Sequence, residues 1–276
     1  MTHFIDDHLT ALRAEGRSPN TVDSREELLR RLDRDLPHGL DEATTSELQR
    51  WLGNPDWCSK TRETYWCHIV AYYRWCTRGP RPLLDYDPSQ TMARPHVGRH
   101  LPRVASDDQL AHALANLNRP MLRAVILAAG VGMRASEVAA AEREHFTQRR
   151  VIIHGKGDKT RVVPVPEDVW DEVCGCPDGP LVTHHGQPVD RQWVTVTASR
   201  ALTSIGFPRL SLHWFRGAYA TRLRRSGVDT LAISKLLGHS SAATTQRYVE
   251  LDEDDLAVAV ARMPRLTEAV RTPADQ

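Results

Sequence analysis

The chain of 276 residues is 41% hydrophobic and 26% charged, the composition of a soluble globular protein with room for two domains. No apolar run approaches the roughly 18 residues that a membrane-spanning helix needs, the N-terminus lacks the basic and apolar regions of a signal peptide, and the five scattered cysteines do not form a disulfide framework. These features exclude a membrane protein and a disulfide-stabilised secreted protein, and they predict a cytoplasmic location.

The formal net charge of +1 hides an uneven distribution. Residues 1–95 contain 13 basic and 15 acidic side chains, residues 96–249 contain 20 and 13, and residues 250–276 contain 3 and 7. A basic central region is expected of a surface that binds phosphates. A merely solvated basic surface would have the same composition, so the charge alone leaves both interpretations open.

The first ninety residues predict helices. About fifteen residues precede the first predicted helix, which starts at Ser18-Pro19, an N-cap followed by a proline at the first helical position. A short helix is predicted from about Thr45 and a long one from about Ser59. We therefore expect residues 1–85 to form a helical domain.

Three prolines interrupt the next segment, residues 86–104, and exclude a regular helix there. Arg94, Arg99 and Arg103 lie in this segment, which has no acidic residue after Asp87. The one-sided charge favours a linker that also lies along a nucleic-acid backbone. A flexible linker without such a contact is the alternative.

Residues 105–250 predict a second domain. Ser106 is an N-cap before one helix, and Pro120 begins an apolar helix. The β-branched runs around Ile152 and Val163 flank a glycine-rich turn, which predicts a β-hairpin. The predicted fold class is mainly α (α+β), with an N-terminal helical domain and a mostly helical C-terminal domain that contains one small antiparallel sheet.

Six polar residues in the second half of the chain have side chains suited to phosphate chemistry. Two arginines offer planar forks of N–H donors, a lysine and two histidines can donate or accept protons, and a tyrosine offers a nucleophilic oxygen. Their contexts are Gly-Met-Arg-Ala-Ser-Glu, Gly-Lys-Gly, His-Trp-Phe-Arg, Leu-Gly-His and Thr-Thr-Gln-Arg-Tyr. The six residues are Arg134, Lys156, His213, Arg216, His239 and Tyr248.

In order and spacing, this set resembles the catalytic residues of the tyrosine recombinase (phage integrase / Xer-like) family. The resemblance is close over about residues 106–250 and weaker over residues 1–95. It implies a site-specific DNA recombinase that cleaves and rejoins DNA through a 3′-phosphotyrosine intermediate. It also implies no cofactor, because arginines do the work of a metal ion. Separately, Cys174 and Cys176 are separated by one residue, a spacing that does not suit a common structural zinc site.

The resemblance assigns phosphate binding to the two arginines. Arg134 precedes a predicted helix start, where Glu137 would orient it. Arg216 lies three residues after His213, which would be the general base. The family commonly has a histidine where this chain has Gly217, so the packing around that position must differ.

The remaining implied roles concern proton transfer and attack. Lys156, on the turn of the predicted hairpin, would protonate the departing 5′ oxygen, and Lys159 on the same turn is the alternative. His239 would donate a hydrogen bond to the phosphate, and Tyr248 would attack it. A tyrosine hydroxyl with a pKa of about 10 needs such neighbours to act as a nucleophile at neutral pH.

Further basic residues are candidates for DNA contacts outside the active site. For Arg161, either a backbone phosphate or an acidic side chain is the expected partner. The candidates are Lys60, Arg62, Arg94, Arg99, Arg103, Lys159 and Arg161.

The resemblance also implies partners. These are double-stranded DNA with a specific recombination site, further copies of the chain in a tetramer on synapsed DNA, and an accessory DNA-bending or directionality factor; no membrane partner is expected. Residues 251–276 predict a tail helix, whose apolar segment Leu256–Met263 either packs on its own domain or docks on a neighbouring protomer.

The departure at Gly217 and the short N-terminal region favour a compact integrase that integrates or excises a phage or mobile element. It would act in the cytoplasm of a bacterial cell or of a phage-infected host. The alternatives are an Xer-type chromosome-dimer resolvase, a type IB topoisomerase-like enzyme, and a DNA-binding module of the same fold without catalysis.

Overall fold

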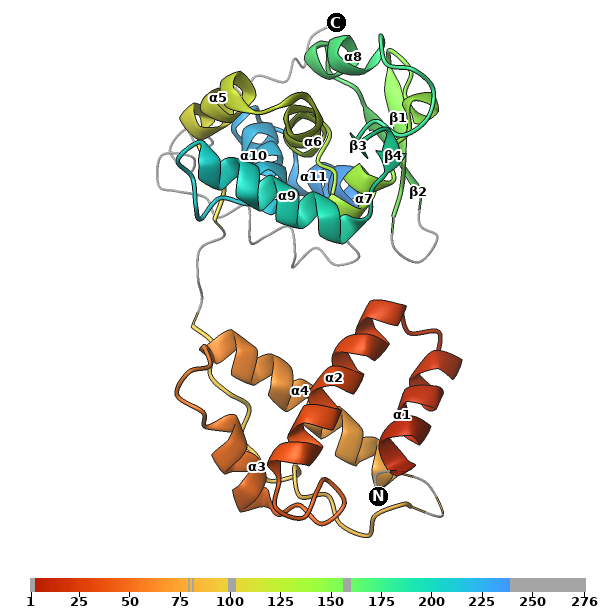
Figure 1. Cartoon of the computed structure of the whole chain (residues 1–276), viewed down its shortest axis with the longest axis vertical. Helices are drawn as coiled ribbons and strands as arrows, with labels where there is room; N and C mark the ends of the chain where they lie inside the picture. The colour runs from red at the N-terminus through yellow and green to blue at the C-terminus, as the bar shows by residue number, and fades with distance from the viewer. Residues whose placement is uncertain (1–2, 79, 81, 99–102, 156–159, 239–276) are drawn as a thin grey trace, which may run out of the picture. The chain divides into compact units, whose positions relative to one another are not determined.

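The computed structural model describes residues 3–78, 80, 82–98, 103–155 and 160–238 (Figure 1). The chain divides into two compact units, residues 1–100 and residues 101–276. Each unit has a hydrophobic core of its own.

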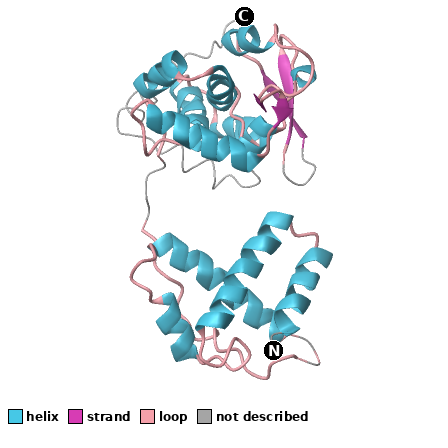
Figure 2. Cartoon of the chain, viewed as in Figure 1, coloured by secondary structure: helices cyan, strands magenta, loops and turns pink. Residues whose placement is uncertain are grey.

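The first unit is built from helices (Figure 2). They are α1 (His3–Ala14), α2 (Pro19–Asp35), α3 (Thr45–Leu52) and α4 (Ser59–Cys76). The helix predicted after Ser18 is confirmed, with Pro19 in its first turn. Leu29 and Leu32 of α2 and Tyr73 of α4 are fully buried, so the apolar faces of these two helices form the centre of the core.

Helix α1 is an element that the sequence analysis did not predict. Ile5, Leu9 and Leu12 are buried, at a spacing that places them on one face of a helix. This face packs on α2 and α4. The same spacing is visible in the sequence and would have indicated the helix.

A cluster of nitrogen-containing side chains, buried or half-buried, lies where these three helices meet. His8 of α1 is only 2% exposed, and its Nε2 lies 3.4 Å from Nη1 of Arg25 on α2. Burial and the charge of Arg25 lower the pKa of His8 to about 4, although Glu15 acts in the opposite direction. The same two causes lower the pKa of His68 on α4 to about 4. Both imidazoles are therefore neutral in the folded unit at neutral pH.

The first unit should lose stability as the pH falls from about 6.5 towards 4. In this range the unfolded chain takes up protons on His8 and His68 that the folded unit does not accept, so unfolding is favoured. The protection factors of amides in α1 and α4 of the full-length protein, which are corrected for the intrinsic exchange rate at each pH, should fall over this range, and His8→Phe should reduce the fall. An equal fall in His8→Phe and in the control His38→Gln, at an exposed position, would contradict the assignment.

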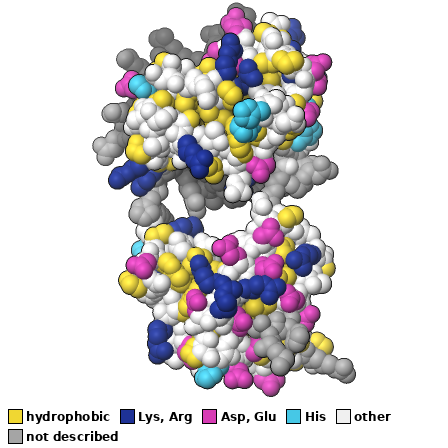
Figure 3. Space-filling model, in the orientation of Figure 1, with side chains coloured by type: hydrophobic (Ala, Val, Ile, Leu, Met, Phe, Trp, Pro, Cys, Tyr) yellow, Lys and Arg dark blue, Asp and Glu magenta, His cyan; other side chains and the backbone are white. Residues whose placement is uncertain are grey.

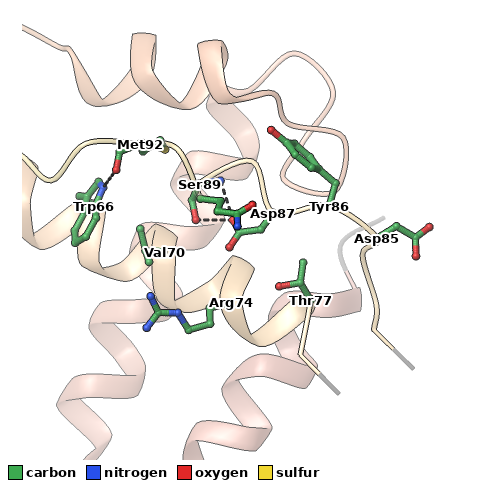
Figure 4. Close-up of a pocket in the computed structure, with 10 residues that line it drawn as sticks. Trp66, Val70, Arg74, Thr77, Asp85, Tyr86, Asp87, Ser89 and Met92 are labelled. Carbon is green, nitrogen blue, oxygen red and sulfur yellow. Dashed lines mark hydrogen bonds between the residues drawn. The ribbon is translucent and has the colours of Figure 1, made fainter. Parts of the chain in front are cut away.

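The segment after α4 packs back on the first unit. Trp66 of α4 donates a hydrogen bond from Nε1 to the carbonyl oxygen of Met92 (3.2 Å), and the Ser89 hydroxyl donates to Oδ1 of Asp87 (2.6 Å). Figure 4 shows these side chains at a hollow beside α4. Ser89 and Met92 are buried. The predicted linker therefore begins with residues that belong to the packed first unit.

In its described residues, the second unit is mostly helical, with two small antiparallel sheets (Figure 2). Its elements are α5 (Asp107–Asn116), α6 (Arg119–Gly130), α7 (Ala135–Ala139), the 3-10 helix η1 (Arg143–His145), β1 (Arg150–His154), β2 (Thr160–Pro164), α8 (Glu167–Val173), β3 (Thr183–His184), β4 (Gln187–Pro188), α9 (Arg191–Ser204), α10 (Leu212–Arg225) and α11 (Thr230–Leu237). Helix α6 packs against α10, and Leu127 of α6 and Phe215 of α10 are fully buried between them. None of the helices in the described ranges is both long and apolar enough to cross a membrane.

The predicted hairpin is confirmed. Strands β1 and β2 are antiparallel, with Ile152 opposite Val162, and Val151, Ile153 and Val163 point into the core. The predicted helix starts at Ser106 and near Pro120 are confirmed as well. The predicted mainly helical fold class is therefore correct.

A second, shorter hairpin corrects the expectation of a single sheet. Strands β3 and β4 pair through Thr183 and Pro188 and through His184 and Gln187. The two loop residues between them, His185 and Gly186, both have positive φ, at 51° and 76°. This is the backbone of a type I′ turn, which suits a two-residue hairpin loop.

Candidate active site

The site is built around the turn between α6 and α7. Gly132 in this turn has a φ of +69°, and a Cβ atom there would lie 2.7 Å from Cδ1 of Tyr219. Only glycine fits both the backbone and the space. The turn makes Arg134 the N-cap of α7, and its backbone N–H donates to Oε2 of Glu137 (2.8 Å).

Glu137 is buried and accepts hydrogen bonds from arginines on different elements. Arg134 donates from Nη1 (2.8 Å), and Arg161 of β2 donates from Nη1 and Nη2 (2.7 and 2.8 Å). Nη1 of Arg216, on α10, lies 3.7 Å from Oε2 of the same carboxylate. Burial alone would raise the pKa of Glu137, but the hydrogen bonds and charges of Arg161 and Arg134 outweigh it and lower the pKa to about 2.

The same arginines bind the last carbonyl groups of α11. Leu236 accepts from Nε of Arg161 (2.8 Å), Leu237 from Nη2 of Arg216 (2.6 Å), and Gly238 from Nη2 of Arg134 (3.0 Å). Carbonyl groups at a helix C-terminus lack partners within the helix and carry partial negative charge. Three guanidinium groups therefore hold the C-terminal end of α11 in place through hydrogen bonds.

His213 lies one turn before Arg216 on α10. Its side chain is exposed, whereas Arg216 is 2% exposed. Partial desolvation, followed by the charges of Arg216 and Arg134, lowers the pKa of His213 below its usual value. These influences favour the neutral form of the imidazole, which is the form that can accept a proton.

The structure thus brings together three of the six candidate residues, Arg134, His213 and Arg216, and joins the arginines through Glu137. Gly217 lies buried in α10, directly after Arg216. The other three of the six candidates, and Lys159 as the alternative to Lys156, lie outside the described residues. They are Lys156, Lys159, His239 and Tyr248.

The model of the phage integrase family matches residues 104–254, more than half of the chain. The chain belongs to the phage integrase family. It is a site-specific tyrosine recombinase and therefore a DNA strand transferase, as the sequence analysis predicts.

Two relatives show how far the similarity of this recombinase extends. It is 29% identical to tyrosine recombinase XerC of Corynebacterium efficiens over 267 residues, covering 88% of this chain and 85% of the relative. It is 30% identical to tyrosine recombinase XerC of Mycobacterium tuberculosis over 264 residues, covering 85% of each chain.

Solved structures share the fold of this recombinase. One is a lambda integrase dimer bound to a COC′ core site, with a TM-score of 0.75, 16% identity, and coverage of 92% of this chain and 79% of that chain. Another is the Tn1549 transposon integrase in complex with a circular intermediate DNA, with a TM-score of 0.74, 16% identity, and coverage of 95% and 99%. At these identities the likeness concerns the fold.

The predicted DNA contacts of the recombinase differ in their surroundings. Lys60 and Arg94 are exposed and both donate to the Glu63 carboxylate. Arg62 donates from Nη2 to the carbonyl oxygen of Asn54 (2.9 Å). These contacts neither require nor prevent binding to DNA.

Two further candidates belong to the second unit. The guanidinium of Arg103 lies over the ring of Trp214, 5.8 Å from its centroid. Arg161 is half-buried and donates to Glu137, so of its two expected partners the structure shows the acidic one. Arg99 lies outside the described residues. Within the described ranges, no three His, Cys, Asp or Glu side chains come together as a possible metal site.

Proposed function

We propose that this recombinase cleaves double-stranded DNA at a specific site, with Arg134 and Arg216 holding the scissile phosphate and Tyr248 attacking it. The observation that carries the proposal is the pair of arginines fixed on one buried carboxylate, Glu137, beside His213, whose pKa their charges and partial desolvation lower. Guanidinium groups fixed in this way can stabilise the negative charge that grows on a phosphate during attack, without reorganising at that moment.

The proposed reaction consists of two transesterifications. The Tyr248 hydroxyl gives its proton to His213, its oxygen bonds to phosphorus, and the bond to the 5′ oxygen breaks as that oxygen receives a proton from Lys156. A 3′-phosphotyrosine remains, and the 5′ hydroxyl of a partner strand reverses the step. The bond energy stays in the covalent link, so no ATP is needed.

For the biological role, we infer integration or excision of a phage or mobile element, in a bacterial or phage-infected cytoplasm. We also infer a tetramer on synapsed DNA, with an accessory DNA-bending or directionality factor. The names of the two XerC relatives, at 29% and 30% identity, favour chromosome-dimer resolution as the second candidate.

We further infer that the first unit binds DNA beside the cleavage site. Figure 3 shows Lys and Arg side chains gathered over α2 and α4 on the face in view, with acidic side chains among them. Lys60 and Arg62 lie in the first turn of α4.

For the tail, residues 251–276, we infer docking on a neighbouring protomer.

The test is to trap and sequence the DNA. Wild-type protein should form a covalent adduct with genomic and phage DNA fragments, and sequencing the trapped fragments should return one core sequence. A core in a phage or mobile-element attachment site would support the integrase role. A core near the replication terminus would favour dimer resolution, and absence of any adduct would refute the proposed reaction.

Lys156→Ala should cleave slowly, and a substrate with a bridging sulfur in place of the 5′ oxygen should restore its rate. Sulfur leaves without a proton, so a missing general acid no longer matters. Single-turnover cleavage of the oxygen and sulfur substrates measures the effect. Lys159→Ala is the matched control, and rescue of that variant in place of Lys156→Ala would transfer the role to Lys159.

A further inference from the structure

We propose that Arg161 is a positioning residue of the recombinase, which sets Arg134 and Arg216 for phosphate binding by holding Glu137 and the end of α11 in place. The inference rests on the proposed function of those two arginines. It gives Arg161 a role inside the protein in place of a contact with DNA.

The contacts of Arg161 use its guanidinium as a fork. Nη1 and Nη2 bind the two carboxylate oxygens of Glu137 at 2.7 and 2.8 Å, while Nε binds the carbonyl oxygen of Leu236 at 2.8 Å. Only arginine offers three such donors in one plane. One side chain of β2 therefore ties the hairpin to α7 and to α11.

Packing holds this side chain in its position. Arg161 is 11% exposed, and a Cβ atom added to Gly238 would lie 3.0 Å from its Cδ. Gly238 ends α11 with a φ of +63°. The aliphatic part of Arg161 thus lies against the turn at which the chain leaves α11.

Loss of Arg161 would change the balance of charges around Glu137. The carboxylate would lose two of its charge-assisted hydrogen bonds and would keep Arg134 and Arg216 as its cationic partners. Arg134 and Arg216 would both be drawn towards the Glu137 carboxylate, whose negative charge Arg161 now helps to neutralise. The carbonyl oxygen of Leu236 would lose its hydrogen-bond donor. A displacement of about 1 Å in groups that position a reacting atom can slow a reaction about 100-fold.

The experiment compares Arg161→Ala, Arg161→Lys and the control Arg150→Ala, which removes an exposed arginine from the partner strand β1. The single-turnover cleavage rate at saturating DNA and the dissociation constant over a range of salt concentrations are measured with a nicked half-site. The melting temperature is measured on the protein alone. Arg161→Lys keeps the charge but cannot form the fork.

Both Arg161 variants should cleave about 100-fold more slowly at saturating DNA, while Arg150→Ala should stay within about threefold of wild type. The salt dependence of binding should be unchanged, because no phosphate contact is lost. In a Glu137→Gln background, Arg161→Ala should cause little further loss, since the two residues act through the same contact.

Several results would overturn the proposal. If Arg161 contacts a phosphate, the slope of log K against log salt would fall by about 0.9 in magnitude for Arg161→Ala. Full additivity with Glu137→Gln, a cleavage rate near wild type, or failure of both Arg161 variants to fold would also refute a positioning role. Adduct formation by wild type and by Arg150→Ala tests the proposed function separately.

Discussion

Tyr248→Phe should abolish the covalent protein–DNA adduct while DNA binding stays nearly unchanged. The substitution removes one oxygen, which is the proposed nucleophile, and keeps the ring. The measurement is denaturing gel electrophoresis of protein incubated with a nicked suicide substrate, together with a gel shift of the same substrate. Wild-type protein should give the adduct and the shift, and the variant should give the shift alone.

Two outcomes would speak against this assignment. An adduct formed by Tyr248→Phe would mean that another side chain attacks the phosphate. Loss of both the adduct and the shift would mean that Tyr248 contributes to binding or folding. Tyr86→Phe is a matched control, because Tyr86 is an exposed tyrosine of the first unit, and it should form the adduct as wild type does.

Arg134→Ala and Arg216→Ala should each reduce cleavage far more than binding. Removing one such donor to a developing negative charge typically costs about 2.7–4 kcal/mol, or about 100- to 1000-fold in rate. Single-turnover cleavage at saturating DNA measures the effect. The control is Arg222→Ala, an exposed position on the same helix as Arg216.

The two variants should differ in stability. Arg216 is buried beside Glu137, and removing one partner of a buried ion pair costs about 3–5 kcal/mol. Arg134 has a side chain that is 38% exposed, so its loss should lower the melting temperature less. Cleavage must therefore be assayed below the melting temperature of Arg216→Ala. A cleavage rate that falls by less than about tenfold in either variant would show that the arginine in question does not act in the active site.

Much of the fold could be predicted because its signals are local. Ser106 accepts a hydrogen bond from the backbone of Gln109 three residues on, and Pro19 fixes the first turn of α2. Alternating β-branched residues around Ile152 and Val163 form the predicted hairpin. In each case a few neighbouring residues determine the backbone, so the sequence alone carries the information.

The family and the identity of the candidate catalytic residues could also be predicted, because their types and short contexts occur in a fixed order. That order located Arg134, His213 and Arg216, which the structure then places close together. It gave no distances between them, because the turn at Gly132 and the packing of α10 set those.

The partners of Arg161 were decided by the tertiary structure alone. A basic residue beside a glycine-rich turn suits a DNA phosphate and a buried acid equally well in the sequence. Its partners lie 24 residues away at Glu137 and 75 residues away at Leu236. No local pattern encodes such pairings, because they form only when packing brings β2, α7 and α11 together. Packing also removes water from the Glu137 carboxylate, and a buried carboxylate is stable only when protein groups donate hydrogen bonds to it.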